Sequence, residues 1–138
     1  MTGNRDFLQQ MYAGDRASQW LGITVDQDDE GRAVAHMTVT DDMQNGFGIC
    51  HGGILFALAD TAFAFACNSG EQVTVAATAS MDFLVPVVPG DQLTAVAEVR
   101  RAGGRTGVYD ITVYDQTGAN VALFRGRSHA TPQRHART

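Results

Sequence analysis

Residues 45–69, NGFGICHGGILFALADTAFAFACNS, hold the longest apolar segment of the chain, and this segment decides the fold. His51-Gly52-Gly53 precedes the apolar run and Asn68-Ser69-Gly70 follows it, which are typical start and stop signals of a helix. The interior, ILFALADTAFAFA, is apolar on every face apart from Asp60, which predicts a central helix covered on most sides by other elements. This run is too short, and too interrupted by a carboxylate, to span a bilayer comfortably.

The segments around this helix have the pattern of β-strands. ITVDQDDEGRAVAHMTVT, residues 23–40, predicts two strands around a turn at 29–31, and residues 5–20 have apolar positions at helical spacing. Further strands are expected at 73–88, 91–100, 108–115 and 121–130, with turns at 101–107 and 117–120 and a polar tail from 132. A sheet with one buried face needs something laid across that face. The sequence therefore predicts an α+β fold, a curved antiparallel sheet of five to six strands around the central helix.

The composition is that of a folded, acidic chain. Its 138 residues predict one domain, 1–138, and its hydrophobic fraction of 44% and charged fraction of 18% exclude a disordered protein. The N-terminus lacks a basic region followed by an apolar run, so we expect no signal peptide. Cys50 and Cys67 have neither metal-binding nor disulfide spacing. A reduced, cytoplasmic location is the expectation.

Basic side chains are concentrated in the C-terminal part of the chain. Residues 1–99 contain 3 Arg against 13 Asp or Glu, whereas residues 100–138 contain 7 Arg against 2 Asp, and lysine is absent. A nucleic-acid reader is usually basic overall, so a net charge of −5 argues against that class. Guanidinium groups suit phosphate and carboxylate. The basic part is either a solvated strand edge and tail or the binding site of a phosphate-bearing ligand.

The stretch NGFGICHGGILFALAD, residues 45–60, resembles the signature of hotdog-fold acyl-CoA thioesterases, above all the PaaI type of the phenylacetate pathway. TASMDFLVPVVPGDQL, residues 78–93, and the chain from 97 to 126 are also similar to that family, so the resemblance covers about residues 20–131. It implies the hotdog fold, in which the curved sheet wraps around the central helix. It also implies hydrolysis of an acyl-CoA, with an arylacetyl group such as phenylacetyl or hydroxyphenylacetyl, and no cofactor.

Gly52 and Asp60 carry the chemistry that this activity needs. The first turn of a helix has N–H groups without partners, and these can hold the negative charge that grows on a thioester oxygen under attack. Gly52 and Gly53 let a carbonyl approach without a Cβ clash, and the resemblance gives Gly52 the role of oxyanion donor. A carboxylate on an apolar helix is costly unless it is paired or functional, and burial raises its pKa. Asp60 is expected to act as general base or as nucleophile.

The spacing of these two residues predicts a shared site. Eight residues along a helix correspond to ~12 Å, yet both groups must come within roughly 3 Å of one reacting centre. One helix cannot satisfy both, so each site is expected to combine Gly52 of one subunit with Asp60 of another. A two-fold dimer with antiparallel central helices builds two such sites at once. The resemblance agrees, and it implies a further pairing into a dimer of dimers.

Other positions are candidates for supporting roles. Asn45 matches the family's active-site Asn or Gln and is expected to orient water or the thioester, while His51 is expected to support Asn45 or its loop. The family's helper hydroxyl one turn after the carboxylate is replaced by Ala64, so Thr61 and Thr78 are the substitutes considered. The remaining candidates are Phe47 and Phe63 for the acyl group, and Arg100, Arg101 and Arg105 for the phosphates of coenzyme A.

Several other chemistries lack their residues. Cys50 and His51 are neighbours in sequence, which weakens a Cys–His dyad, and no G-x-S-x-G motif is present. The four histidines are scattered, so no metal site is expected. Two alternatives stay open. One is a hotdog hydratase or dehydratase that uses His51 as base, and the other is an acyl-CoA-binding module without catalysis.

Overall fold

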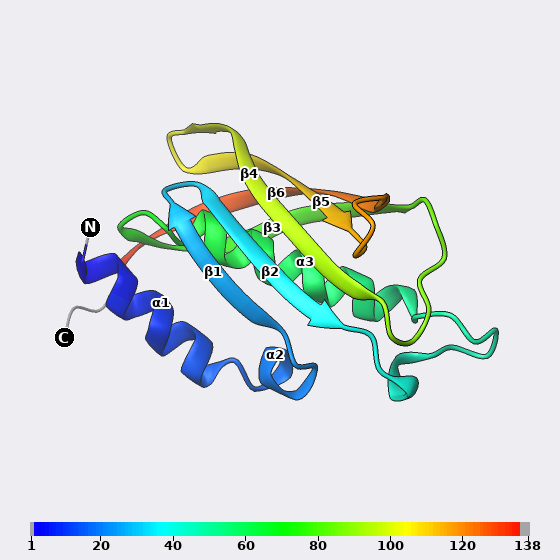
Figure 1. The fold of residues 1–138 in the computed structure, drawn as a ribbon. Helices are drawn as coiled ribbons and strands as arrows, with labels where there is room; N and C mark the ends of the chain where they lie inside the picture. The colour runs from blue at the N-terminus through cyan, green and yellow to red at the C-terminus, as the bar shows by residue number, and fades with distance from the viewer. Residues whose placement is uncertain (1, 136–138) are drawn as a thin grey trace.

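The computed structural model describes residues 2–135, and it contains a six-stranded antiparallel sheet curved around one long helix (Figure 1). The strand order is β1-β2-β4-β5-β6-β3, so β1 and β3 form the two edges. The helices are α1 (Thr2–Gly14), α2 (Arg16–Trp20), the 3₁₀ turn η1 (Asp41–Met43) and α3 (Gly52–Cys67). The strands are β1 (Thr24–Asp29), β2 (Arg32–Thr38), β3 (Gln72–Phe83), β4 (Gln92–Gly103), β5 (Thr106–Tyr114) and β6 (Asn120–Arg134). This is the predicted hotdog arrangement.

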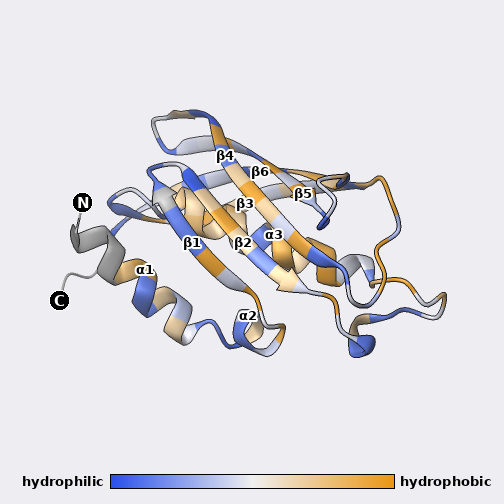
Figure 2. Ribbon diagram, in the orientation of Figure 1, coloured by the Kyte–Doolittle hydropathy of each residue, from blue (hydrophilic) through white to orange (hydrophobic). Residues whose placement is uncertain are grey.

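Helix α3 begins and ends where the sequence indicates. His51 is its N-cap, and the His51 Nδ1 atom accepts a hydrogen bond from the Gly53 N–H at 3.3 Å. Asn68 is the C-cap, and its side chain donates to the Ala64 carbonyl at 2.8 Å. The helix is coloured as largely hydrophobic and lies in the hollow of the sheet (Figure 2). The prediction of a central helix under a curved sheet is confirmed.

The sheet turns one set of alternating side chains toward α3. On β6, Phe124 and Gly126 face the helix, and a Cβ atom on Gly126 would lie 2.7 Å from ring atoms of Phe63. Glycine is therefore required here by the close approach of the Phe63 ring. On β2 and β4 the buried positions are mostly alanines, which lets the helix lie close to the strands. These alanines are Ala33, Ala35, Ala95 and Ala97.

The N-terminal region differs from the expected single helix over residues 5–20. Gly14 ends α1, and Asp15 then caps the separate short helix α2 by accepting the Ser18 N–H at 3.0 Å. An aspartate whose side chain accepts the N–H three residues later starts a new helix, and this competes with continuation of the first helix. The break turns α2 toward the open side of α3, where Ser18 is buried.

Both edge strands are open on their outer side within the described chain. Strand β3 pairs with β6 alone, and most of its 12 residues are exposed. The segment after β3 exposes further apolar side chains, namely Leu84, Val85 and Val88. The last strand continues to Arg134, beyond the expected end at 130. Within the described residues, the helices are all too short or too polar to cross a membrane.

Candidate active site

A groove of about 210 Å³ lies at the N-terminal end of α3. Asn45 and Gly52 line it, together with the segment that follows β3. The rest of its wall is mainly apolar and consists of Ile49, Cys50, Leu55, Phe83, Leu84, Val85, Pro86 and Val87. The groove thus combines polar groups at one end with a hydrophobic surface large enough for a small acyl group.

Gly52 offers a backbone N–H that has no acceptor within the described part of the chain. The next donor, the Gly53 N–H, is taken by His51, and the Ile54 N–H bonds to the His51 carbonyl at 2.9 Å. The Phe83 ring lies over Gly52, because a Cβ atom added there would be 3.2 Å from Phe83 Cζ. The free donor therefore sits at the positive end of the helix dipole, beside an aromatic ring.

Asn45 uses only one end of its amide within its own loop. Its Oδ1 atom accepts the Phe47 N–H at 2.8 Å and the Ile49 N–H at 3.4 Å. The loop is closed further by the Asn45 N–H, which donates to the Ile49 carbonyl at 2.8 Å. These bonds fix the orientation of the amide and leave the NH₂ group available as a donor toward the groove.

His51 has a local structural role. Its Nδ1 lone pair is occupied by the helix cap, and its backbone N–H donates to the Met43 carbonyl at 2.8 Å. The predicted supporting function is thus directed to the start of α3, with no hydrogen bond to Asn45 within the described residues. A base role through Nδ1 is blocked by the capping bond.

Asp60 lies half-buried in the middle of α3. Burial, and then the negative charge of Asp15, raise the pKa of its carboxyl group above the ordinary value. Within the described residues the Asp60 carboxylate makes no hydrogen bond or ion pair, so nothing offsets its desolvation. A carboxylate with raised proton affinity and free oxygens has the properties of a base or nucleophile.

The structure keeps Gly52 and Asp60 on one unbroken helix. Because α3 is continuous from Gly52 to Cys67, these residues are separated by ~12 Å along its axis. Asn45 and Gly52 line the same groove, whereas Asp60 is absent from its lining. A single chain therefore presents the Gly52 N–H and the Asp60 carboxylate as two separate candidate half-sites.

Three residues suggested from the sequence lie away from the groove. Phe63 is 1% exposed and packs on Phe124 in the core, which corrects its assignment to the acyl group. Thr78 pairs with Arg127 on the outer face of the sheet, opposite to the face that holds α3, so its assignment is also corrected. The Thr61 hydroxyl donates to the Ala57 carbonyl at 2.8 Å and faces Ser18 at 3.1 Å.

Phe47 and the arginines are exposed. Phe47, at 92% exposure, lies in the loop after Asn45 and does not line the groove. Arg101 and Arg105 lie in or next to the β4–β5 hairpin, and Arg100 binds Asp110 at 2.8 Å. This hairpin is at the far end of β4 from the Asn45 loop (Figure 1). Within one chain these arginines are therefore remote from Gly52.

Cysteine and metal chemistry have no support among residues 2–135. Burial raises the pKa of the Cys50 thiol to about 11, so the thiol stays protonated at neutral pH. No group of three or more His, Cys, Asp or Glu residues in this part of the chain is placed to hold a metal ion.

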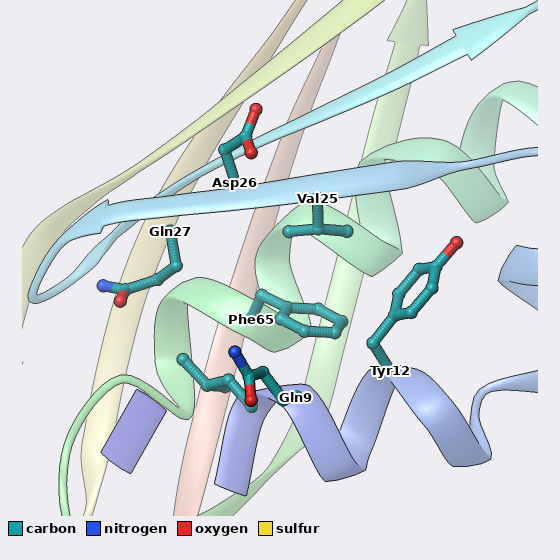
Figure 3. Close-up of a pocket in the computed structure, with 7 residues that line it drawn as sticks. Gln9, Tyr12, Val25, Asp26, Gln27 and Phe65 are labelled. Carbon is teal, nitrogen blue, oxygen red and sulfur yellow. The ribbon is translucent and has the colours of Figure 1, made fainter. Parts of the chain in front are cut away.

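A second hollow, of about 380 Å³, lies between α1, β1 and the C-terminal part of α3 (Figure 3). Tyr12 and Phe65 both line it, with ring centroids 6.5 Å apart, and the Tyr12 hydroxyl donates to the Ile23 carbonyl at 2.6 Å. None of the residues singled out from the sequence lines this hollow. It marks where α1 packs loosely on the body of the fold.

Sequence reasoning missed two features near the half-sites. The strand predicted over 73–88 includes Leu84 and Val85, but these residues follow the end of β3 and line the groove. The helix predicted over 5–20 includes Asp15 and Ser18, but these residues bring α2 against Thr61, the neighbour of Asp60. The signal that could have found the second feature is Gly14-Asp15, a helix stop followed by an N-cap residue.

Comparisons with known proteins point to one family. The model of the Thioesterase superfamily matches residues 47–122. The chain is 55% identical over 119 residues to the acyl-coenzyme A thioesterase PaaI of Escherichia coli strain K12, which covers 86% of this chain and 85% of that protein.

Solved structures agree with this match. The structure of the E. coli PaaI protein from the phenylacetic acid degradation operon superposes with a TM-score of 0.92 at 49% identity, covering 96% of both chains. A variant of the phenylacetic acid degradation protein PaaI from Thermus thermophilus gives a TM-score of 0.80 at 36% identity. That match covers 85% of this chain and 100% of the Thermus chain.

Proposed function

This chain belongs to the thioesterase superfamily and is an acyl-CoA thioesterase of the hotdog fold, and we propose that it releases an arylacetyl group, phenylacetyl or hydroxyphenylacetyl. The groove beside Gly52 supports the proposal, because Phe83, Leu84 and Val85 contribute apolar side chains to its wall. A volume of about 210 Å³ suits a ring with a one-carbon spacer better than a long flexible chain. The PaaI proteins to which the chain is similar come from phenylacetic acid degradation.

The proposed reaction uses three groups. The Gly52 N–H and the start of the helix dipole stabilise the negative oxygen that forms when the thioester carbonyl is attacked. The Asn45 NH₂ group, whose partner oxygen is held by the loop, orients the thioester or the attacking water. Asp60 either removes a proton from water or attacks the carbonyl itself. In both routes the C–S bond breaks and the sulfur of coenzyme A leaves as a thiol after taking up a proton.

A single-turnover reaction in ¹⁸O-labelled water separates these two routes. If Asp60 acts as base, the released acid carries ¹⁸O in the first turnover. If Asp60 attacks, an anhydride forms, and water attacking the Asp60 carbonyl leaves the first acid unlabelled. Several turnovers remove the difference, so enzyme must be in excess of substrate.

The dimer is proposed as the unit that holds a complete site. Strand β3 is an exposed edge strand of 12 residues, and such edges are ready to pair with another chain. Pairing of β3 with its copy about a two-fold axis continues the sheet and sets two α3 helices antiparallel. Gly52 of one subunit then comes near Asp60 of the other. We extend this proposal to a dimer of dimers, in which each subunit is a single domain. We also propose a cytoplasmic location, where cysteines stay reduced and acyl-CoA esters are found.

Phosphate binding is assigned to the β4–β5 hairpin. Arg101 and Arg105 are exposed there, and Arg100 shares Asp110 with Arg125. The hairpin lies toward the end of the molecule where α3 ends, which in an antiparallel dimer adjoins the partner's groove. Coenzyme A bound across the two subunits brings its phosphates within reach of these guanidinium groups.

The decisive experiment measures thiol release from a panel of acyl-CoAs. Phenylacetyl-CoA and hydroxyphenylacetyl-CoA are compared with acetyl-, hexanoyl- and crotonyl-CoA. We expect the highest kcat/KM for the arylacetyl esters, and a loss of at least ~100-fold in Asp60→Asn with the oligomer intact. Equal rates for hexanoyl-CoA would disprove the arylacetyl preference. Hydration of crotonyl-CoA without thiol release would instead establish the hydratase alternative.

A further inference from the structure

Asp15 is a second carboxylate directed to the neighbourhood of Asp60, from an element outside the family's sheet and helix core. It lies at the junction of α1 and α2 and belongs to the same chain as Asp60. Its negative charge is the second cause, after burial, that raises the pKa of Asp60. A negative charge nearby disfavours the ionised form of a carboxyl group.

Hydrogen bonds hold Asp15 in a fixed place. Its two oxygens accept from Ser18, Oδ1 from the backbone N–H at 3.0 Å and Oδ2 from the hydroxyl at 2.6 Å. Its own N–H donates to the Tyr12 carbonyl at 3.0 Å, and the Gln19 side chain donates to the same carbonyl at 2.8 Å. The carboxylate is therefore part of a closed turn and cannot swing freely into solvent.

Ser18 connects this turn to the catalytic helix. Its side chain is 2% exposed, and its Oγ atom lies 3.1 Å from Thr61 Oγ1, while Thr61 donates to the Ala57 carbonyl. Each hydroxyl donates its one proton elsewhere, Ser18 to Asp15 and Thr61 to the Ala57 carbonyl, so Ser18 and Thr61 are in close contact without a hydrogen bond between them. This contact packs the turn that holds Asp15 against α3, at the residue next to Asp60.

We propose that Asp15 is a positioning residue for hydrolysis, whose negative charge the α1–α2 turn holds against the part of α3 that carries Asp60 and Thr61. The inference rests on the proposed role of Asp60 as base or nucleophile. A base of higher proton affinity accepts a proton from water more readily, and a more basic carboxylate attacks a carbonyl more readily. The effect comes from a charge at a fixed position, without contact between Asp15 and substrate.

Few other charges bear on Asp60. On its own helix the titratable neighbour is Cys67, and on α2 it is Asp15, with Arg16 next to it but exposed. The strands packed against α3 turn apolar side chains toward it, with Tyr109 of β5 as the titratable group among the described residues there. Both Cys67 and Tyr109 are neutral near pH 7, since burial raises their pKa values to about 12. Asp15 is thus the negative charge that adds to the effect of burial on the pKa of Asp60.

The test compares the pH dependence of kcat/KM in wild type and Asp15→Asn. Asparagine caps helices as well as aspartate does, so α2 is retained while the charge is removed. Activity requires ionised Asp60, and removal of a like charge favours ionisation. The acidic limb of the profile therefore moves to lower pH. At one pH unit below the wild-type midpoint, the variant is expected to keep about two to five times more of its plateau rate than wild type.

Controls separate charge from structure. Asp115→Asn removes an equal charge from a carboxylate that also accepts backbone N–H bonds in its turn, but between β5 and β6. Its profile should match wild type, whereas Asp15→Ser, another good N-cap, should reproduce Asp15→Asn. The proposal is overturned if the acidic limb of the pH profile stays in place in both Asp15 variants. It is also overturned if the limb moves equally far in Asp115→Asn.

A direct titration keeps this test independent of the proposed function. The carboxyl ¹³C resonance of Asp60, assigned by its loss in Asp60→Asn, is followed against pH with and without the Asp15→Asn change. A lower midpoint in the variant supports the inference even if no acyl-CoA is hydrolysed. An active enzyme whose Asp60 midpoint is the same in both backgrounds refutes it and leaves the thioesterase assignment standing.

Discussion

Asp60 is the one acidic side chain of α3. The half-buried position that suits its proposed role in hydrolysis also lowers the stability of the fold. Burial and the Asp15 charge raise its pKa, so the folded state binds a proton more tightly than the unfolded chain does. The sign follows directly: ionised Asp60 destabilises the fold at neutral pH, and this penalty fades as the pH falls and the carboxyl becomes protonated in both states. Active sites commonly sacrifice stability in this way.

We therefore predict that Asp60→Asn raises the free energy of unfolding at pH 7 while it abolishes thiol release. Urea unfolding at pH 7 and at pH 4, at one protein concentration, measures the effect. The difference in free energy of unfolding between the variant and wild type should be smaller at pH 4 than at pH 7. A variant less stable than wild type at pH 7 would show that Asp60 has a structural role.

Asp110 illustrates the opposite sign. Arg125 binds it through Nε at 2.6 Å and Nη2 at 2.8 Å, and Arg100 adds a bond at 2.8 Å. Hydrogen bonds from Arg125, then Arg100, lower the pKa of Asp110 to about 2. The ion cluster thus stabilises the fold above the unfolded pKa of about 3.9, and the contribution is lost as the pH falls toward 2.

The expected result is a flatter pH dependence in Asp110→Asn. Between pH 4 and pH 2 the free energy of unfolding should fall more steeply in wild type than in the variant. Urea unfolding at each pH measures this free energy. Asp42→Asn, at an exposed carboxylate outside the cluster, should keep the wild-type slope. Parallel curves for wild type and Asp110→Asn would remove Asp110 from the acid response.

At the scale of elements, the end of α3 is joined to both β3 and the C-terminal residues by Asn68. Its Nδ2 atom donates to the Ala64 and Thr74 carbonyls, while its Oδ1 atom accepts the Thr74 N–H and lies 3.0 Å from His135 Nε2. The His135 ring in turn stacks on Phe7, with centroids 3.7 Å apart. One buried amide therefore links the central helix and an edge strand to His135 and, through its ring, to α1.

Replacement of Asn68 by alanine should destabilise the fold by about 2–4 kcal/mol, because the hydrogen bonds of its buried amide to the Thr74 N–H and carbonyl are lost. Chemical denaturation at a fixed protein concentration measures this. Asn120→Ala is the matched control, since Asn120 Oδ1 is buried without a hydrogen bond in the described structure, and we expect less than about 1 kcal/mol there. Equal losses in the two variants would contradict the linking role of Asn68.

The elements show where sequence reasoning succeeds. The position of helix α3 was predictable, because its apolar run and its capping residues are local features of the sequence. The β1–β2 turn was predictable because Gly31 marks it. The break at Asp15 and the orientation of Thr78 were not predicted. Thr78 follows a register shift between Ala76 and Thr78, and such an irregularity exchanges the two faces of a strand without a clear signal in the sequence. The assignment of Phe63 to the core depends on Gly126, 63 residues away in the chain.

Mixed dimers distinguish active sites shared between two subunits from sites contained in one chain. Asp60→Asn and Asn45→Ala subunits are each expected to be inactive as homodimers. A mixed dimer has one site with both residues intact, so random mixing should restore about a quarter of wild-type activity, and purified heterodimer about half. Co-expression with two affinity tags provides the mixed dimers, and thiol release is the measurement.

Sites contained in one chain would give a different result. Mixed dimers would then stay as inactive as their parents, because neither chain carries both Asn45 and Asp60. A mixture of Asp60→Asn with wild type serves as the reference for the efficiency of exchange. Recovery in the mixed dimer thus tests the two-fold arrangement without a structure of the assembly.

The pairing of β3 with β6 alone has a consequence for synthesis on the ribosome. β3 ends at Phe83, but its partner strand begins only at Asn120 and is completed at Arg134. During translation β3 therefore stays unpaired until β6 has been synthesised, and such distant pairing is slow. The edge proposed to join two subunits is then the last part of the sheet to form. In the proposed dimer, a working catalytic centre would thus appear only when two chains that have each completed β6 meet.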